Sequence, residues 1–166
     1  MPSLKISLET EADAPILSEL AAEAFGPGRF ARSAYRVREG VAPVASLCLA
    51  GWLDERLVGG IRFTAIRIGA EENASLLGPV VVAPAMKGNG YGKALVEEGV
   101  ARVRQEGFGL VLLVGDMPYY GRFGFQPIPP GRIILPGPVD PTRLLALELV
   151  PGTLESAVGK VQGYAR

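Results

Sequence analysis

Hydrophobic positions near the start of the chain follow first a strand period and then a helix period. Leu4–Leu8 alternates every second residue, as a strand does. Thr10 or Asp13 can cap the helix that follows. We expect that helix to end at Gly26–Gly28 and a weaker one to cover Arg29–Glu39. The apolar stripe of the first helix consists of Ile16, Leu17, Leu20, Ala21 and Ala24.

The middle of the chain has the pattern of strands. Val44–Leu53 and Leu57–Ile68 predict a hairpin, joined by a polar turn at Asp54–Arg56. Ser75–Ala83 is nearly all apolar, as is typical of a strand covered on both faces. Because Pro79 cannot donate to a ladder, we expect a bulge beside it. Alternation in the second arm of the hairpin separates two faces, with Ile61, Phe63 and Ala65 on one and Arg62 and Thr64 on the other.

The second half of the chain predicts further alternation of helices and strands. Pro151–Arg166 shows no clear period and is expected to be an irregular tail. No repeat or linker divides residues 1–166, so we predict a single α/β (α+β) domain with a mixed sheet. The expected elements are a helix, a strand, a short helix and two strands: Tyr91–Glu106, Gly109–Gly115, Pro118–Phe123, Arg132–Leu135 and Arg143–Leu149.

Composition adds a globular, uncharged background. The chain has 166 residues, of which 48% are hydrophobic and 20% charged, as in globular proteins. Basic and acidic residues both number 17, so net charge gives no reason to expect nucleic acid or a membrane as partner. One cysteine, with neither a membrane-length apolar run nor a signal-peptide core, favours the cytoplasm.

Histidine is absent from the sequence, which narrows the chemistry more than any other count. Ser-His-Asp and Cys-His catalysis and His-ligated metals are excluded, and no metal is expected. Carboxylates, Tyr, Lys, Ser or Thr, Cys48, backbone amides and water remain as groups that could carry the chemistry. Cys48 lies in an apolar strand and is expected to be a small buried hydrophobe.

The densest functional signal is the segment VVVAPAMKGNGYGKAL, Val80–Leu95. A buried strand enters a glycine-rich turn, and the turn enters a helix. Glycines allow close backbone approach, and successive free N–H groups at a helix start bind anions. The pattern predicts a phosphate or pyrophosphate ligand, although an ordinary strand-to-helix turn is the plain alternative. The turn's glycines and flanking charges are Lys87, Gly88, Gly90, Gly92 and Lys93.

Glycine spacing separates this turn from two well-known nucleotide motifs. Neither G-x-G-x-x-G nor the P-loop G-x-x-x-x-G-K-[ST] can be aligned with it. What remains, Lys87-x-x-Gly90-x-Gly92, resembles the Gln/Arg-x-x-Gly-x-Gly/Ala signature of the GNAT family of N-acetyltransferases. Lys87 departs from the usual Gln or Arg but keeps a side chain compatible with phosphate.

A second motif supports the same resemblance. The strand GLVLLVG is followed by Tyr120-Gly121-Arg122-Phe123-Gly124-Phe125, which is similar to the family's Tyr-x-x-x-Gly-Phe. The wording LLGPVVVAP, KGNGYGKAL, GDMPYYGRFGF and LPGPVDPTRLLALEL resembles the acetyltransferase subgroup labelled YhbS-like. The specific motifs span Leu76–Phe125.

The resemblance implies a fold and a cofactor site. The fold would be a mixed, mostly antiparallel sheet of six or seven strands flanked by helices and splayed between strands 4 and 5. Acetyl-CoA would be the co-substrate. Backbone groups of three consecutive valines would hold its pantetheine arm, and the amides of the turn, beside Lys87, would hold its pyrophosphate. The implied residues are Val80, Val81, Val82, Lys87, Gly88, Asn89, Gly90, Tyr91, Gly92 and Lys93.

The resemblance also implies acetyl transfer to a primary amine, by direct attack in a ternary complex. Tyr120 is the implied general acid for the departing thiolate, whereas Tyr119 is expected to be a core aromatic. No base is evident, and Asp116, Glu23 or a water relay are guesses. The arginines at Arg29–Arg38 are expected to form a solvated helix face. Were that helix to lie over the cleft, they would favour an acidic acceptor.

Other readings stay open at this point. A catalytically idle acyl-CoA-binding or sensing module would share the glycine turn, and a nucleotide-binding protein of another class is disfavoured by the failed spacings. The acceptor, a small-molecule or protein amine, is not identified by any motif. A homodimer is also left open.

Overall fold

The structure, a computed structural model, describes residues 3–25 and 33–165. Within them the chain forms nine strands and five α-helices. The strands are β1 (Lys5–Leu8), β2 (Cys48–Leu53), β3 (Arg56–Ile68), β4 (Glu71–Val82), β5 (Leu110–Val114), β6 (Gln126–Pro127), β7 (Ile133–Ile134), β8 (Leu144–Glu148) and β9 (Gly159–Gly163). The helices are α1 (Ala14–Phe25), α2 (Ser33–Arg38), α3 (Tyr91–Gln105), α4 (Met117–Tyr120) and α5 (Thr153–Ser156).

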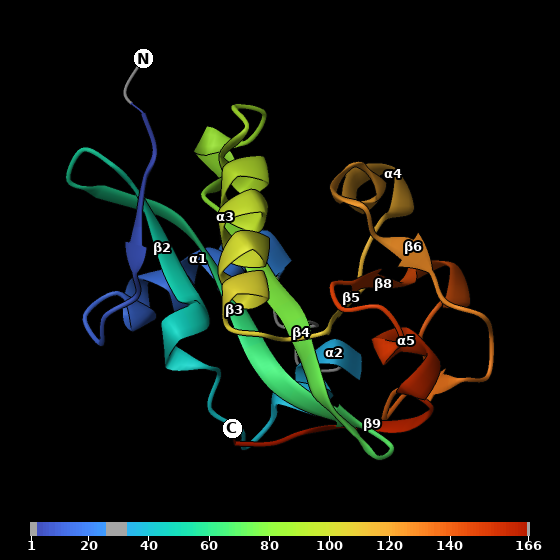
Figure 1. The fold of residues 1–166 in the computed structure, drawn as a ribbon. Coiled ribbons are helices and arrows are strands. Elements are labelled where there is room, and N and C mark those ends of the chain that lie inside the picture. Colours follow the sequence, from blue (N-terminus) through green and yellow to red (C-terminus); the bar gives the residue numbers. More distant parts are fainter. Residues whose placement is uncertain (1–2, 26–32, 166) are drawn as a thin grey trace.

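The strands form one mixed, mostly antiparallel sheet in the order β1-β2-β3-β4-β5-β8-β6. β9 pairs with the far end of β3, and β7 pairs with β9. Within the main path only β4 and β5 run parallel. Figure 1 shows β1–β4 with α3 on one side of the junction between β4 and β5, and β5, β8, β6 and α4 on the other.

The sheet has more strands than the six or seven expected. β7 lies within the strand predicted at Arg132–Leu135, whereas β6, which was not predicted, has two residues, too few for a period of two to be recognised. The expectation of an irregular tail after Pro151 is wrong, because α5 and β9 lie there. β9 is short and exposed at alternate positions, and it depends on pairing with β3, which no local pattern reveals. β4 also begins earlier than the predicted Ser75. It begins at Glu71, so its first residues closely follow β3.

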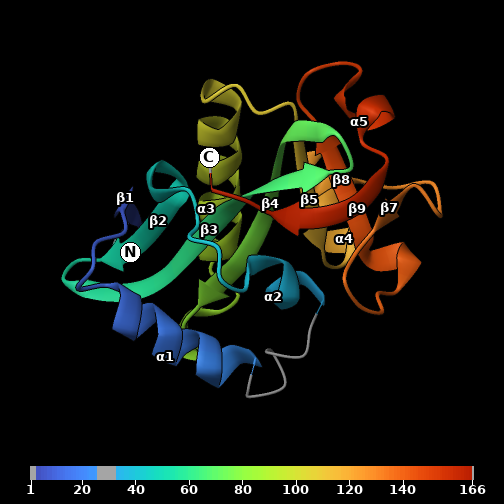
Figure 2. The same ribbon diagram turned by 90° about the horizontal axis from the view of Figure 1, so that it is seen from below.

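Helices cover both faces of the sheet (Figure 2), with α3 on one face and α1 and α2 on the other. α3 packs through Leu95, Val96 and Val103 onto a core that includes Phe63. Gly99 allows this approach, because a Cβ there would lie 2.7 Å from Phe63 Cε1. On the other face, α2 contributes Val37 to a second core cluster and α1 contributes Leu17 to a third.

α1 is less buried than its sequence stripe predicts. Asp13 precedes it as expected of a capping residue, and its carboxylate accepts a hydrogen bond from Thr10 N at 2.9 Å. Leu17 is its only buried residue, and Ile16 is 42% exposed. The helix therefore touches the sheet along a narrow line. The predicted stop at Gly26–Gly28 and the first residues of the predicted second helix lie outside the described residues.

Candidate active site

A bulge interrupts β4 where the sequence predicts it. Two residues of β4 separate Leu77 from Val80, whereas their partners in β3, Phe63 and Ile61, are separated by one. The extra residue falls at Gly78–Pro79, so the bulge expected beside the proline is confirmed. Bulges bend the strand that carries them, and this one lies just before the three valines.

Past this bulge β4 and β5 diverge. Their parallel pairing covers Ala74–Leu76 and Leu110–Leu112 and stops there. Val80–Val82 remain paired with β3 on one side. On the side facing β5, backbone pairing has ended, which confirms the splay predicted between strands 4 and 5. Backbone groups on that edge of β4 are left to a ligand or to water, as an extended ligand arm requires.

The glycine turn sits at the end of the divergent part of β4. Gly88 and Gly90 have φ values of +84° and +81°, in the left-handed region that favours glycine. A Cβ at either position would meet nothing within 4 Å, so the turn is open on its outer side. The Asn89 side chain donates to Met86 O at 2.9 Å and closes the turn, so that it stabilises the turn's shape.

The helix that follows the turn begins with N–H groups that have no partner within the helix. The first hydrogen bond of α3 runs from Ala94 N to Gly90 O, at 3.0 Å. The preceding N–H groups of a helix have no acceptor within it, and the helix dipole makes them attractive to an anion. Lys87 is exposed beside the turn, while Lys93 forms a 3.7 Å ion pair with Glu97. The N–H groups that precede this bond at the start of the helix belong to Tyr91, Gly92 and Lys93.

A cavity of about 850 Å³ opens where the two strands part. Val80 and Val81 line it from β4, and Leu113 to Asp116 line it from the end of β5. Its other walls are α1, α2 and the face of β3 that carries Arg62 and Thr64. A pocket at a break between adjacent parallel strands is a common ligand site. The cavity is large enough for a small acceptor next to a thioester.

Tyr120 borders this cavity from α4. Its ring stacks edge-on against Phe125, with ring centroids 6.0 Å apart, and lies directly over Gly115. A Cβ at Gly115 would be 2.5 Å from Tyr120 Cε2, so the glycine makes room for the ring. Burial, and then the neighbouring Tyr119 and Asp116, raise the pKa of Tyr120 to about 12. The phenol therefore stays protonated across the physiological range.

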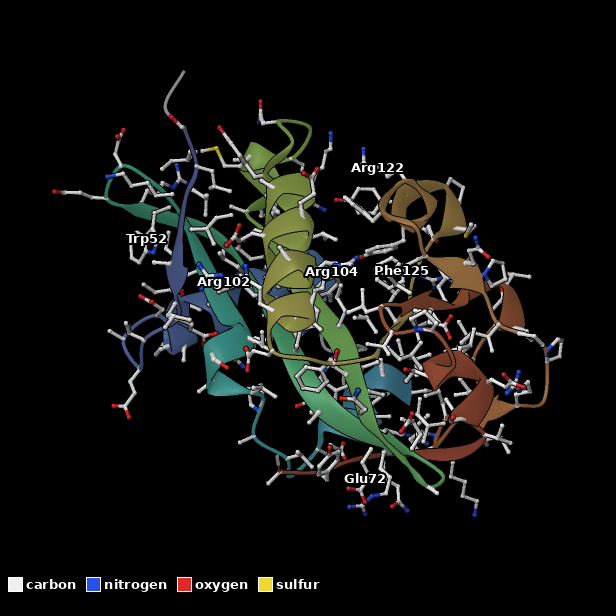
Figure 3. The ribbon with its side chains drawn as sticks, in the orientation of Figure 1. Trp52, Glu72, Arg102, Arg104, Arg122 and Phe125 are labelled. Atoms are coloured by element: carbon white, nitrogen blue, oxygen red, sulfur yellow. The ribbon has the colours of Figure 1, made fainter. Side chains whose placement is uncertain are left out.

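Tyr119 points elsewhere. Its hydroxyl lies 3.0 Å from the position a Cβ would take on Gly92, in the first turn of α3. The Arg122 guanidinium lies over its ring, 4.3 Å from the centroid, and Figure 3 shows Arg122 at the edge of α4 that faces α3. Tyr120, and not Tyr119, packs against the main core cluster. The expectation that Tyr119 is the core aromatic is wrong, because the Tyr119 side chain extends toward the glycine turn.

Comparison with known proteins identifies the family. The sequence matches the Acetyltransferase (GNAT) family over residues 15–125. The chain belongs to the GNAT acetyltransferase family. That match contains the bulge, the splay, the glycine turn and Tyr120, all of which lie within the GNAT region.

Two curated relatives from Escherichia coli (strain K12) are named as N-acetyltransferases. The uncharacterized N-acetyltransferase YjhQ is 30% identical over 120 residues, covering 70% of this chain and 66% of that relative. The uncharacterized N-acetyltransferase YhbS is 28% identical over 123 residues, covering 73% of this chain and 72% of that relative. The chain thus spans just under two thirds of the length of YjhQ.

Two crystal structures are similar to this GNAT chain. YhbS from Escherichia coli, solved in complex with CoA, has a TM-score of 0.79 at 24% identity, covering 99% of this chain and 91% of that one. A GNAT acetyltransferase from Brucella melitensis, solved in complex with acetyl-CoA, has a TM-score of 0.62 at 29% identity, covering 89% and 97%. The first comparison shows the shared fold.

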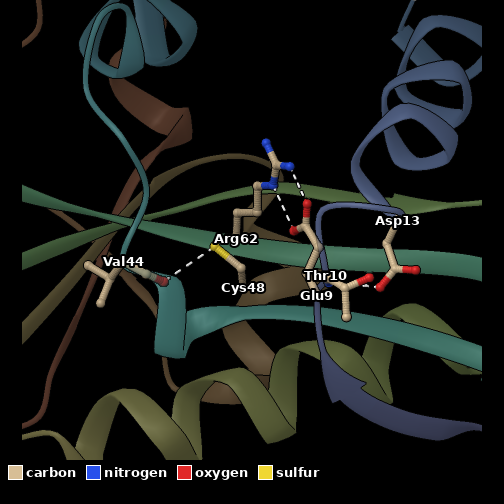
Figure 4. A network of polar contacts seen from close by, with 6 residues as sticks. All are labelled: Glu9, Thr10, Asp13, Val44, Cys48 and Arg62. Atoms are coloured by element: carbon tan, nitrogen blue, oxygen red, sulfur yellow. Dashed lines mark hydrogen bonds and ion pairs between the residues drawn. The ribbon is translucent and has the colours of Figure 1, made fainter.

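At the wall of the GNAT cavity, Arg62 forms a half-buried ion pair with Glu9 that sequence reasoning missed (Figure 4). Arg62 donates from Nε to Glu9 Oε2 at 2.9 Å and also from its terminal nitrogen to Oε1. The Glu9 side chain is 6% exposed, and this bond raises the pKa of Arg62. Alternation placed Arg62 on the face opposite Phe63, but its partner lies 53 residues earlier. That separation leaves no local signal.

Cys48 lies beside this pair and is not a nucleophile. Its Sγ donates to Val44 O at 3.3 Å. Burial, and then the Glu9 carboxylate, raise the pKa of the thiol to about 11. A protonated, buried thiol is inert, which fits the interpretation of Cys48 as a small hydrophobe.

The described residues offer no strong general base. Asp116 is 74% exposed at its side chain and lies 3.5 Å from Arg143, and Glu23 is exposed on α1. The carboxylates that line the cavity are exposed: Glu39, Asp116 and Asp140. Within residues 3–25 and 33–165 no group of His, Cys, Asp or Glu side chains could hold a metal ion, and no helix there is long and apolar enough to cross a membrane.

Proposed function

We propose that this protein transfers the acetyl group of acetyl-CoA to a primary amine, by direct attack within a ternary complex. The observation that carries the proposal is the parting of β4 and β5 above a cavity that Tyr120 borders, with an anion-binding turn at the end of β4. The acetyl-CoA complex of the Brucella melitensis relative supports the choice of co-substrate.

The backbone holds the co-substrate in this proposal. The free edge of Val80, Val81 and Val82 pairs with the pantetheine arm as an added strand would. The turn residues Gly88, Asn89, Gly90, Tyr91, Gly92 and Lys93 offer N–H groups to the pyrophosphate, and Lys87 adds charge at its rim. The structure fits such a ligand, since these amides precede the first hydrogen bond of α3 and the turn is open to solvent.

The chemistry needs a neutral amine, a polarised carbonyl and a proton for the thiolate. The amine nitrogen attacks the thioester carbon, and an N–H on the free edge of β4 stabilises the oxyanion. The C–S bond then breaks, and the thiolate takes the Tyr120 proton. The acceptor nitrogen loses its proton to solvent, from which Tyr120 is reprotonated. Products are the N-acetylated amine and CoA thiol.

The raised pKa of Tyr120 shapes its role. A phenol with a pKa near 12 is a weaker acid than a thiol, so complete proton transfer to a free thiolate is unfavourable. Tyr120 therefore donates a hydrogen bond to sulfur while charge develops, and the proton moves only as the C–S bond breaks. We propose bulk water, reached through the open cavity, as the base for the amine.

A thiol-release assay tests this function. Acetyl-CoA is mixed with the protein and a panel of amines, amino acids, aminoglycosides and peptide N-termini, and free CoA thiol is measured. We expect release with at least one amine class and none without an acceptor beyond slow hydrolysis. Acetyl-CoA binding without release for the whole panel would contradict acetyl transfer and favour an acyl-CoA-binding module.

We further propose that residues 1–166 act as a single N-acetyltransferase domain in the cytoplasm. The family match covers residues 15–125, and the C-terminal strands β8 and β9 complete the same sheet. The lone, buried Cys48 fits a reducing compartment. Co-purification and gel filtration of the whole chain would decide whether it acts as a monomer or a homodimer.

A further inference from the structure

One arginine reaches the cavity without an acidic partner. Arg38 ends α2 and lines the cavity across from the parting strands. Its Nη1 lies 3.0 Å from the position a Cβ would take on Gly78, at the bulge of β4. Its guanidinium also lies over the Tyr35 ring, 5.8 Å from the centroid. Arg38 therefore faces the cavity at the bulge and is not part of a solvated helix face, whereas Arg36 is exposed.

The other arginines of the cavity are already paired. Arg62 is held by Glu9, and Arg143 lies 3.5 Å from Asp116. Among the residues that the structure describes, no ion pair or hydrogen bond is found for Arg38. Burial lowers its pKa to about 10, so it is desolvated yet still charged at neutral pH. Holding a desolvated, unpaired charge destabilises a fold, and such costs are typical of functional sites.

We propose that Arg38 binds the carboxylate of the acceptor, and that the acceptor is a small amine that carries a carboxylate. A guanidinium presents a planar fork of donors that matches a carboxylate in a bidentate manner. The inference rests on the proposed acetyl transfer and names the substrate class for it. Arg62 and Arg143 also line the cavity, but each has a carboxylate beside it, whereas Arg38 has none among the described residues.

The position of Arg38 also limits the size of the acceptor. Gly78 lies two residues before Val80 on β4, which is about 7 Å along a strand. An Arg–carboxylate bond takes up about 2.8 Å of such a span. The carboxylate and the reacting nitrogen should thus be separated by a few bonds, as in an α- or β-amino acid.

A matched series of acceptors tests this. Glycine, β-alanine and γ-aminobutyrate are each compared with the corresponding amide in the thiol-release assay, with wild type, Arg38→Gln, Arg38→Lys and the control Arg36→Gln. Arg36 is exposed on the same helix, and its substitution by glutamine removes the same charge. We expect the free acids to be preferred, and Arg38→Gln to lower their kcat/KM roughly 10- to 100-fold. The amides should change less than about threefold, Arg38→Lys should recover part of the loss, and Arg36→Gln should match wild type.

A binding measurement separates this inference from the acetyl transfer itself. N-acetylglycine and N-acetyl-β-alanine, and their amides, are titrated into the CoA-loaded protein by calorimetry. Suppose that the acids bind to wild type but not to Arg38→Gln, and that no amine is turned over. That result would support the anion site at Arg38 and contradict acetyl transfer. Equal turnover of acids and amides, equal losses for both in Arg38→Gln, or binding of the acids that ignores Arg38 would overturn the inference. Unchanged thermal stability of Arg38→Gln shows that the variant is folded.

Discussion

The two sides of the parted strands are built from different parts of the chain. On the α3 side, the recognition that we propose depends on the backbone: the free edge of β4 and the amides of the glycine turn. On the opposite side, the cavity is lined by side chains that arrive from separate elements: Arg38 from α2, Arg62 from β3 and Tyr120 from α4. The first side is encoded within one continuous segment, and the second exists only once the sheet has formed.

This difference has consequences for mutation. A backbone site tolerates changes of side chain but not of backbone shape or of charge within the turn. A side-chain site responds to the loss of single functional groups. The variants below are chosen to separate the two responses, starting with the largest expected effect.

Tyr120→Phe tests the side-chain half most severely. It keeps the ring that packs on Phe125 and over Gly115 but removes the hydroxyl. We expect kcat to fall about 10²- to 10⁴-fold, or roughly 3–5 kcal/mol of barrier, while acetyl-CoA affinity holds. Turnover and acetyl-CoA binding are measured on the same preparation. A fall of less than about fivefold would make Tyr120 a structural aromatic.

Tyr119→Phe is the matched control. Its hydroxyl lies near Gly92, in the turn that we propose binds the pyrophosphate. We expect a modest rise in the KM for acetyl-CoA and a nearly unchanged kcat. A large loss of kcat confined to this variant would assign the acid to the other tyrosine.

Gly90→Asp tests the backbone half. The residue has a positive φ and directly precedes α3, so aspartate adds both strain and a negative charge at the turn. Acetyl-CoA at about 100 times its Kd stabilises a binding protein by roughly 2.7 kcal/mol, and we expect this thermal shift to disappear. Gly90→Asn is nearly isosteric and tolerates the left-handed region, so it should keep much of the shift. Loss in both variants would indicate strain alone.

The pH dependence of Tyr120 sharpens the comparison without changing any contact. An unfolded tyrosine ionises near 10, whereas the pKa in the folded protein is about 12. The folded state thus holds this proton longer, so its stabilising contribution is complete below pH 10 and is lost between pH 10 and 12. The difference in phenolate absorbance between wild type and Tyr120→Phe reports the ionisation of Tyr120, and we expect its midpoint above pH 11. A midpoint near 10 would mean that the ring is solvated.

Cys48→Ala and EDTA should have the smallest effects. The thiol is buried, its pKa is raised, and it lies beside the Glu9–Arg62 pair on β2. Removing it leaves a small void that costs about 1 kcal/mol of stability at most, with turnover unchanged. Turnover assays with and without EDTA check both. A strong loss with either treatment would contradict direct attack.

Sequence reasoning reached the backbone half and missed most of the side-chain half. Gly90, Pro79 and Gly124 each act on the local backbone, so the turn, the bulge and the end of the short helix could be predicted without tertiary contacts. Glu9 and Arg62 lie 53 residues apart, and Arg38 meets β4 at Gly78 across the fold. Such contacts depend on sheet order, which a single sequence does not specify. The same reason hid β9, whose pairing with β3 joins distant segments.

The central claim is that the parted strands carry acetyl transfer, and the stoichiometry of the reaction tests it most directly. Wild type and Tyr120→Phe are incubated with isotope-labelled acetyl-CoA and the best amine of the panel, and free thiol and labelled amine are counted together. We predict equal amounts of thiol and acetylated amine from wild type, with both lost in Tyr120→Phe although acetyl-CoA still binds. Thiol release without labelled amine, or equal yields from the two proteins, would contradict it.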